Sequence, residues 1–203
     1  MLQLTPEGDF DFSCFFLVAE EAEFLFSQNG GETYKHNVLS QKTLLTSLYS
    51  DKELNSFISY VLFYLSQLDI PVKRGTFVEF RSSLINICPV GRNASCEERL
   101  AFSEYDREHH VREKMINDLQ QRFSQLHFTY LIGGLTSFDV VPEGMDKTFC
   151  LQYLTDYDTI YFFGDKTNKG GNDYEIYVDP RTIGYSVTCP KDTKAICEKL
   201  FLH

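Results

Sequence analysis

The 203-residue sequence predicts an α/β protein made of three blocks, with boundaries near residues 40 and 145. Two observations support this fold class. The middle block combines helical periodicity with pairs of strand-like runs, which is typical of an α+β unit whose sheet is mainly antiparallel. In the last block, helix-like and strand-like segments alternate, and this order favours a parallel sheet. The chain is long enough for one large domain or two small ones.

The first block, residues 1–40, is short and ambiguous. We expect the opening strands of a parallel core here, yet only residues 23–26, ahead of an Asn-Gly-Gly sequence, look like a strand. The apolar run 14–19 is too short to span a bilayer and follows acidic residues, which argues against a transmembrane helix and against a signal peptide. We therefore expect a cytoplasmic protein.

The middle block contains three expected helices. The first ends before Pro71, and its apolar residues follow the i, i+3, i+4, i+7 rule. These residues are Leu54, Phe57, Ile58, Val61, Leu62 and Leu65. Ser95 and Glu98 form a capping box that opens the next helix. A further helix, with apolar residues four apart, follows over about residues 111–123.

Two hairpins are expected in the same block. Residues 76–81 and 84–88 are strand-like and flank two serines, which make a two-residue turn. Residues 128–132 and 137–141 form a second pair of strands around two glycines. Together with the helices, these strands predict an α+β unit over residues 41–144.

The last block, residues 145–203, begins with an expected helix over 146–154 and ends with one over 191–200. Residues 160–163 are all apolar, which predicts a strand buried on both faces. A second strand is expected near 185–187. Asp165 comes directly after the first strand, at the end where ligands bind in α/β sheets.

Asp165 and Asp173 stand on either side of a glycine-rich turn. Carboxylates are hard oxygen ligands of the kind that Mg²⁺ prefers, so the pattern suggests a metal and phosphate site. A solvated turn whose acidic side chains act as caps explains the same pattern. Both interpretations stay open at this point.

The chain has 19 Lys and Arg against 29 Asp and Glu, a formal charge of -10. This balance argues against nucleic acid and anionic membrane surfaces as partners, so any bound anion needs a local basic cluster. Arg81, Arg92 and Arg99 are candidates, because a guanidinium group binds phosphate in a bidentate manner. Ser137 and Asp139, which alternate on one strand, offer contacts to a sugar.

Each of these observations has a plainer explanation. The arginines could pair with nearby acids such as Glu79, Glu97 or Glu98 on a solvated surface. Alternation on the strand also fits a half-buried strand without a site. The six cysteines include no C-x-x-C pair, which fits reduced thiols better than disulfides or a zinc site.

Several runs, in order along the chain, closely resemble the eukaryotic phosphomannomutases of the haloacid-dehalogenase superfamily. They are residues 74–81, 86–92, 97–99, 133–134, 137–139, 142–147, 163–167, 170–173 and 179–182. The resemblance implies a Rossmann-like core that carries a metal and an aspartate nucleophile, with an inserted α+β cap that recognises the sugar phosphate and mediates homodimerisation. It also implies interconversion of mannose 6-phosphate and mannose 1-phosphate, through a bisphosphate intermediate, for GDP-mannose synthesis.

The resemblance further implies roles for single residues. The family's substrate-binding positions fall on Arg81, Arg92, Arg99, Ser137 and Asp139. Lys147 falls on a catalytic lysine that balances charge around the phosphorylated aspartate. Asp165 falls on the Mg²⁺ aspartate, with Asp173 as its second acid, and a further cation-binding loop falls on Tyr177, Asp179 and Thr182.

The sequence departs from the family at its start. The family's Asp-x-Asp-Gly-Thr motif, which supplies the nucleophile and the general acid and base, is absent, and Asp9-Phe10-Asp11 is the only similar spacing. We therefore expect a chain truncated or rearranged over residues 1–40, an incomplete core, and no turnover of mannose phosphates. The alternative is a non-catalytic relative that binds sugar phosphates or dimerises.

Overall fold

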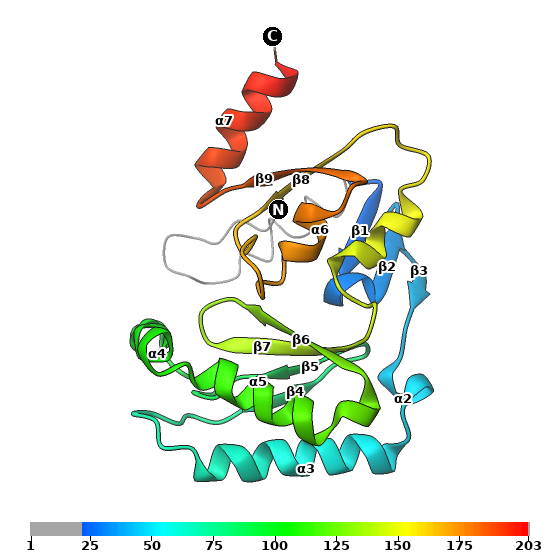
Figure 1. Cartoon of the computed structure of the whole chain (residues 1–203). Coiled ribbons are helices and arrows are strands. Elements are labelled where there is room, and N and C mark those ends of the chain that lie inside the picture. The colour runs from blue at the N-terminus through cyan, green and yellow to red at the C-terminus, as the bar shows by residue number, and fades with distance from the viewer. Residues whose placement is uncertain (1–21, 203) are drawn as a thin grey trace. The chain divides into compact units, whose positions relative to one another are not determined.

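The computed structural model of the protein describes residues 22–202 (Figure 1). The spacing Asp9-Phe10-Asp11 therefore lies outside the described residues. The chain divides into two compact units. We call residues 41–146 the central unit, and the described residues 22–40 together with 147–202 the flanking unit. Within the described part of the chain, no helix is both long enough and apolar enough to cross a membrane.

A four-stranded antiparallel sheet forms the framework of the central unit. Its strands are β4 (Val78–Phe80), β5 (Ile85–Ile87), β6 (Phe128–Gly133) and β7 (Ser137–Pro142), in the order β4-β5-β7-β6. Both expected hairpins are present, since β4 pairs with β5 and β6 pairs with β7. The backbone N–H of Arg81 donates to the carbonyl of Leu84 (2.9 Å), which closes the turn over the two serines.

The helices of the central unit agree with the sequence pattern. They are α2 (Leu45–Leu48), α3 (Asp51–Gln67), α4 (Cys96–His109), α5 (Val111–Arg122) and the 3₁₀ helix η2 (Ser124–Leu126). Capping boxes open α3 at Ser50 and α4 at Ser95. His110 takes a left-handed conformation (φ 53°) between α4 and α5, which separates them into two helices.

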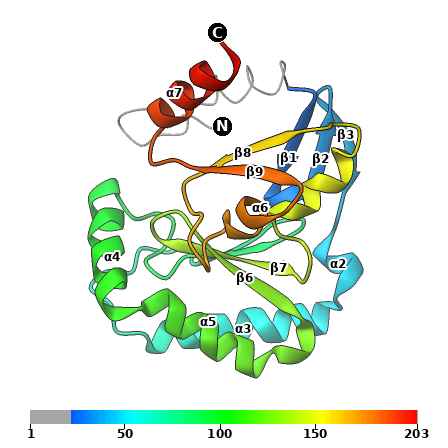
Figure 2. The same ribbon diagram turned by 45° about the horizontal axis from the view of Figure 1, so that its top comes forward.

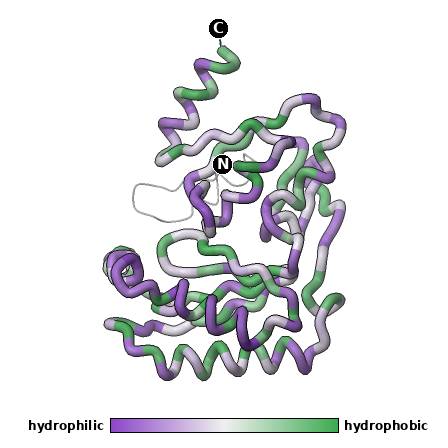
Figure 3. The backbone as a smooth tube through the Cα atoms, viewed as in Figure 1, coloured by the Kyte–Doolittle hydropathy of each residue, from purple (hydrophilic) through white to green (hydrophobic). Residues whose placement is uncertain are grey.

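Helices α3 and α5 pack on the same face of the sheet (Figures 1 and 2). Hydrophobic and hydrophilic residues alternate along α3 (Figure 3), and its buried residues are Leu54, Phe57, Val61 and Leu65. Leu62, which also fits the helical pattern, is 47% exposed. Each buried side chain of this size contributes about 1.5–3 kcal/mol through removal from water. The core of the central unit therefore lies between the two helices and one sheet face.

The first strands of the flanking unit are β1 (Phe24–Ser27), β2 (Glu32–Lys35) and β3 (Val38–Lys42, which ends in the central unit), in the order β1-β2-β3. The strand expected near residues 23–26 exists, but β1 pairs with β2 in an antiparallel manner. Within residues 22–40, the expected opening of a parallel core is therefore wrong. The reason is the 3₁₀ turn η1 (Gln28–Gly30), where Asn29 (φ 56°) and Gly30 (φ 88°) take left-handed conformations and reverse the chain.

The rest of the flanking unit contains the expected parallel pair, β8 (Ile160–Gly164) and β9 (Thr182–Ser186), joined through helix α6 (Tyr174–Val178). The last helix is α7 (Pro190–Phe201). The helix expected at 146–154 is instead a 3₁₀ helix, η3 (Lys147–Tyr153).

Strand β8 was predicted to be buried on both faces, and this prediction was wrong. Tyr161 in β8 is 38% exposed. Within residues 22–202, β8 and β9 form a sheet of two strands, and the ring of Phe201 in α7 meets that of Tyr161 edge to face. A sheet this narrow leaves part of one face uncovered.

Candidate functional site

Three polar residues lie in one row across the sheet of the central unit. Glu79 on β4 pairs with Asn86 on β5, and Asn86 pairs in turn with Asp139 on β7. Their sequence neighbours Ile85 and Phe138 belong to the core under the helices. Because side chains alternate along a strand, the polar row lies on the opposite face of the sheet, away from α3 and α5.

Two arginines bind to this row. The carboxylate of Glu79 accepts a hydrogen bond from Nη2 of Arg81 (3.0 Å) and forms an ion pair with Nε of Arg92 (2.9 Å). Nη1 of Arg92 donates to Oδ1 of Asn86 (2.9 Å), and Nδ2 of Asn86 donates to Oδ1 of Asp139 (2.8 Å). We call these five residues the polar network. The hydrogen bond from Arg81, reinforced by the charges of both arginines, lowers the pKa of Glu79.

The backbone around Arg92 is fixed by a close approach of two glycines. A Cβ on Gly91 (φ 91°) would lie 2.6 Å from the nitrogen of Gly75, so no larger residue fits there without a shift. The N–H of Arg92 donates to the carbonyl of Thr76 (3.1 Å). The strand pairing of β4 and β5 is thus continued by the loop that carries Arg92.

Arg99 lies close to the same loop but does not join Glu79. Its Nε donates to the carbonyl of Ala94 (3.0 Å), and its Nη2 donates to the carbonyl of Arg92 (2.5 Å). Ser137 lies two residues before Asp139 on β7, on the same face of the strand. The structure therefore brings Arg81, Arg92 and Asp139 into one network, with Arg99 bonded to the backbone beside it.

The plainer explanation, in which arginines pair with acids, holds for Arg81 and Arg92, since both bind Glu79. It does not hold for Arg99, which bonds to carbonyl groups, and Glu98 pairs instead with Arg74 (2.6 Å). The pairing leaves the two arginines accessible, because the side chains of Arg81 and Arg92 remain 32% and 41% exposed.

Asn86 and Arg112 of this region were missed from the sequence, and Glu79 was considered only as a surface partner of the arginines. Glu79 and Asn86 each stand between two apolar residues in a short strand, and this lone polar position was a usable signal. Arg112 is buried and pairs with Asp106 (2.7 Å), and its Nη1 donates to the carbonyl of Ser137 (3.0 Å). No feature of the sequence separates Arg112 from the other arginines.

In the flanking unit, Lys147 forms an ion pair with the buried carboxylate of Asp173. Asp173 has a side chain that is 3% exposed, and its Oδ1 accepts a hydrogen bond from Nζ of Lys147. Its Oδ2 accepts from the backbone N–H groups of Asp165 (3.0 Å) and Lys166 (2.9 Å). A Cβ on Gly164 would lie 2.8 Å from this carboxylate, so the glycine is needed to admit it.

The metal ligands expected from the sequence lie in two places, at Asp165 beside Asp173 and in the segment of Tyr177, Asp179 and Thr182. The Asp165 side chain is 64% exposed, with Nζ of Lys166 at 3.9 Å. Asp179 pairs with Arg181 (2.7 Å), whose hydrogen bond lowers the pKa of that carboxyl group. The hydroxyl of Thr182 donates to the carbonyl of Asp179 (3.1 Å).

Tyr177, the remaining expected ligand, packs on Gly184 of β9, where a Cβ would lie 2.5 Å from both the tyrosine ring and its carbonyl oxygen. Among residues 22–202, no group of three His, Cys, Asp or Glu residues is arranged to hold a metal ion. The described residues offer Mg²⁺ the carboxylate of Asp165 but do not complete an octahedral site.

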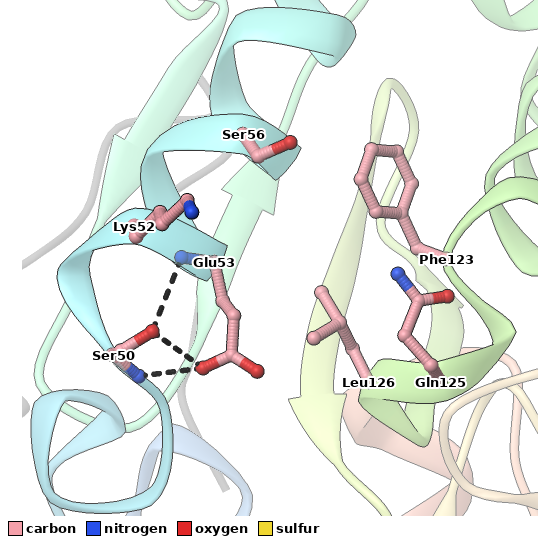
Figure 4. A pocket seen from close by; sticks show the side chains of 7 residues that line it. All are labelled: Ser50, Lys52, Glu53, Ser56, Phe123, Gln125 and Leu126. Atoms are coloured by element: carbon pink, nitrogen blue, oxygen red, sulfur yellow. Dashed lines mark hydrogen bonds between the residues drawn. The ribbon is translucent and has the colours of Figure 1, made fainter.

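The central unit also has two shallow pockets of about 410 and 420 Å³. The first is lined by Ser50, Lys52, Glu53, Ser56, Phe123, Gln125 and Leu126 (Figure 4). Glu53 there accepts hydrogen bonds from the backbone and hydroxyl of Ser50, as part of the α3 cap. None of the site residues expected from the sequence lines either pocket.

Known proteins resemble this chain in sequence and in fold. The sequence model described as eukaryotic phosphomannomutase matches residues 14–203. The chain belongs to this family. Its relatives include the phosphomannomutases of Oryza sativa subsp. indica and Arabidopsis thaliana, each 49% identical over 185 residues, and that of Glycine max, 49% identical over 186 residues. These alignments cover 91% or 92% of this chain and 75% of each relative.

Solved structures agree on the fold of this phosphomannomutase family member. The Streptococcus mutans protein SMU.1108c matches with a TM-score of 0.54 at 13% identity, over 95% of this chain and 86% of that one. An N-terminally truncated, IMP-bound IMP-nucleotidase from Plasmodium falciparum matches with a TM-score of 0.53 at 15% identity, over 85% and 46%. Such likenesses bear on fold alone, and the predicted haloacid-dehalogenase-like α/β fold class is confirmed.

Proposed function

We propose that this chain binds mannose phosphates on the central unit, as a member of the phosphomannomutases that interconvert mannose 6-phosphate and mannose 1-phosphate for GDP-mannose synthesis. The polar network is the observation that carries the proposal. Arg81 and Arg92 are held side by side on Glu79, on the sheet face that α3 and α5 leave open. In a chain of net charge -10, such a local pair of cations is what a phosphate needs.

The geometry assigns separate tasks to the other residues. A guanidinium carries five N–H donors, and the contacts of Arg92 with Glu79 and Asn86 use two of its three nitrogens. The remaining nitrogen can bind a phosphate oxygen. Asp139 and Ser137 lie on the same strand face. The carboxylate of Asp139 can accept hydrogen bonds from the sugar, and the hydroxyl of Ser137 can donate or accept them. Arg99 adds a third cation next to Arg92.

Lys147 is the residue of the flanking unit that we assign to catalysis. It holds a positive charge beside Asp173 and next to the strand end at Asp165. In the family reaction, a positive charge in this position offsets the charge of a phosphorylated aspartate. Magnesium, if bound, would supply further charge there, and Asp165 is the carboxylate that would hold it.

As printed, the chain contains no Asp-x-Asp-Gly-Thr sequence. Mutase chemistry through a bisphosphate needs a carboxylate that, as an acyl phosphate, gives its phosphoryl group to the free hydroxyl of the sugar phosphate and then takes the other phosphoryl group back from the bisphosphate. We therefore propose that these 203 residues bind mannose phosphates but do not turn them over by themselves. This proposal coincides with the alternative raised by the sequence, a non-catalytic relative that binds sugar phosphates or dimerises.

The test is to incubate the purified chain with mannose 1-phosphate, a hexose bisphosphate and Mg²⁺, and to measure mannose 6-phosphate and base-labile phosphoprotein. We expect neither product. Turnover that Asp9→Asn abolishes would contradict this proposal and identify Asp9 as the nucleophile. Turnover that survives Asp9→Asn would also contradict it and would require another carboxylate as the carrier.

We also propose a cytoplasmic homodimer that forms through the central unit. Large apolar side chains are exposed there, among them Phe63 (59%) on α3, Phe80 (45%) on β4 and Leu100 (52%) on α4. Apolar side chains of this size gain free energy when a partner removes them from water. Light scattering on the 203-residue chain should give twice the monomer mass. A monomer at tens of micromolar would contradict the proposal.

A further inference from the structure

Glu79 is not among the residues that the family resemblance assigns to the substrate, yet it contacts two of them. Its carboxylate joins Nη2 of Arg81 at 3.0 Å and Nε of Arg92 at 2.9 Å. Within residues 22–202, Glu79 is the side chain to which the guanidinium of Arg81 is hydrogen-bonded. Without this carboxylate, two like charges would stand close together with no anion between them.

Asn86 holds Arg92 from a second side. Its amide accepts from Arg92 through Oδ1 and donates to Asp139 through Nδ2, so the orientation of the amide is determined by its partners. Asn86 is only 5% exposed, and its position is set by the register of β4, β5 and β7. Arg92 is therefore tied to the sheet at two points, while Arg81 depends on Glu79.

The carboxylate of Glu79 has two opposing effects on a bound phosphate. Its negative charge repels the phosphate directly, which weakens binding. Its hydrogen bond to Arg81 and its ion pair with Arg92 hold both arginines in place before the ligand arrives, which strengthens binding because the side chains need not be ordered during association. Arginine side chains lose considerable rotamer freedom when they are ordered, so the second effect should exceed the first at this partly exposed position.

We propose that Glu79 is a positioning residue for sugar-phosphate binding, which holds Arg81 and Arg92 side by side and acts on the ligand only through them. This inference rests on the proposed function of the central unit. It differs from a direct substrate contact, because a carboxylate that touched the sugar would act whether or not the arginines were present. It also differs from a structural role, which would alter folding rather than the coupling between these residues.

The experiment is a mutant cycle on the whole chain, read by NMR titration with mannose 1-phosphate, which can measure millimolar affinities. Glu79→Gln is made in the native sequence and in the Arg81→Ala/Arg92→Ala background. We expect about a fivefold to tenfold loss of affinity in the native sequence, as for other residues in contact. In the double-alanine background we expect no loss, or a small gain, since only the repulsive charge remains.

Glu108→Gln is the matched control, because Glu108 is an exposed acid on α4 and makes the same change of charge. It should leave the affinity within about twofold of the native value. The Nε–H signal of Arg92 provides a direct readout. The Nε hydrogen of Arg92 should exchange slowly with water in the native chain and quickly in Glu79→Gln. The backbone amide spectra of both proteins should remain those of a folded chain.

The outcomes separate this inference from the proposed function. Native or tighter affinity in Glu79→Gln would overturn the positioning role while leaving mannose phosphate binding intact. An equal loss in both backgrounds would also overturn it, in favour of direct contact with the ligand. If the native chain does not bind mannose 1-phosphate, the proposed function fails, and the same cycle is then read with inorganic phosphate. Coupling there would support positioning, and no phosphate binding at all would overturn both.

Discussion

The polar network of the central unit and the Lys147–Asp173 pair of the flanking unit use similar charged groups at very different depths. In the network, Glu79 and Arg92 are 37% and 41% exposed at their side chains. The side chain of Asp173 is 3% exposed and that of Lys147 is 33% exposed, with Lys147 covering one carboxylate oxygen and two backbone N–H groups covering the other. Water competes for the contacts of the network but has little access to the carboxylate of Asp173.

This difference separates a binding surface from a structural support. An exposed ion pair contributes about 0–1 kcal/mol to stability, so its partners can turn to a ligand at little cost. A buried carboxylate that loses its partner keeps the desolvation penalty, and such losses cost about 3–5 kcal/mol. We therefore expect mutations in the network to change binding more than stability, and mutations of the buried pair to do the reverse.

The largest effect should follow Lys147→Met. It leaves the carboxylate of Asp173 buried without its cation, so we expect about 3–5 kcal/mol less stability in the flanking unit. Hydrogen exchange of the amides in β8 and α6 measures this loss locally. Lys169→Met, at an exposed lysine on the loop that carries Asp173, is the control. Equal protection in the two variants would show that the pair contributes no more than a surface charge.

Next comes the glycine contact that fixes Arg92. Gly91→Ala adds a Cβ against Gly75 at a left-handed φ, so we expect a loss of about 2–4 kcal/mol in urea unfolding, together with weaker mannose 1-phosphate binding. Gly134→Ala is the matched control, because Gly134 also has a positive φ but no atom within 4 Å of its Cβ. It should cost only about 1–2 kcal/mol. The close-contact argument fails if the two substitutions cost the same.

Arg99→Ala should act on binding. Its guanidinium lies beside Arg92, and loss of a charge-assisted hydrogen bond to phosphate would weaken mannose 1-phosphate binding by about 1.5–3 kcal/mol. Arg107→Ala removes a cation from the exposed side of the same helix and should have little effect. Calorimetry that gives the same affinity for Arg99→Ala and the native chain would remove Arg99 from the site.

The smallest effect concerns pH. Because the two arginines lower the pKa of Glu79, its contribution to stability is present above the ordinary carboxyl pKa and is lost as pH falls through the lowered value. Given its exposure, we expect less than about 1 kcal/mol between pH 6 and the acid range. Urea unfolding of the native chain and of Glu79→Gln, at pH 6 and at a pH below the lowered pKa of Glu79, measures the change in the free energy of unfolding. A larger pH dependence in Glu79→Gln than in the native chain would contradict the sign.

The sequence predicted the elements that depend on local patterns better than those that depend on pairing between segments. Local patterns located α3, α4, both hairpins and the parallel pair β8 and β9, since caps, turns and periodicity act over a few residues. The antiparallel pairing of β1 was missed, because the Asn29–Gly30 reversal admits either a hairpin or a strand end. The sequence did not distinguish the 3₁₀ helix η3 from an α-helix.

The candidate site was only partly visible for a similar reason. The arginines could be proposed from their chemistry, and Glu79 and Asn86 lie near them in sequence, but the bond from Asn86 to Asp139 depends on the register between β5 and β7, which are distant in sequence. In the same way, nothing near Asp173 in the sequence identifies Lys147, 26 residues away, as its partner. Resemblance to a family suggested roles for both residues but not the bond between them.

The most direct test of the account is calorimetric titration of mannose 1-phosphate into the native chain and into Arg81→Ala/Arg92→Ala. We expect saturable binding to the native chain and at least a tenfold loss in the variant, since about 1.5–3 kcal/mol is lost for each charge-assisted hydrogen bond removed. Urea unfolding of the variant should stay within about 1 kcal/mol of the native chain. Equal affinity of the two proteins for mannose 1-phosphate would contradict the assignment of the polar network as the binding surface.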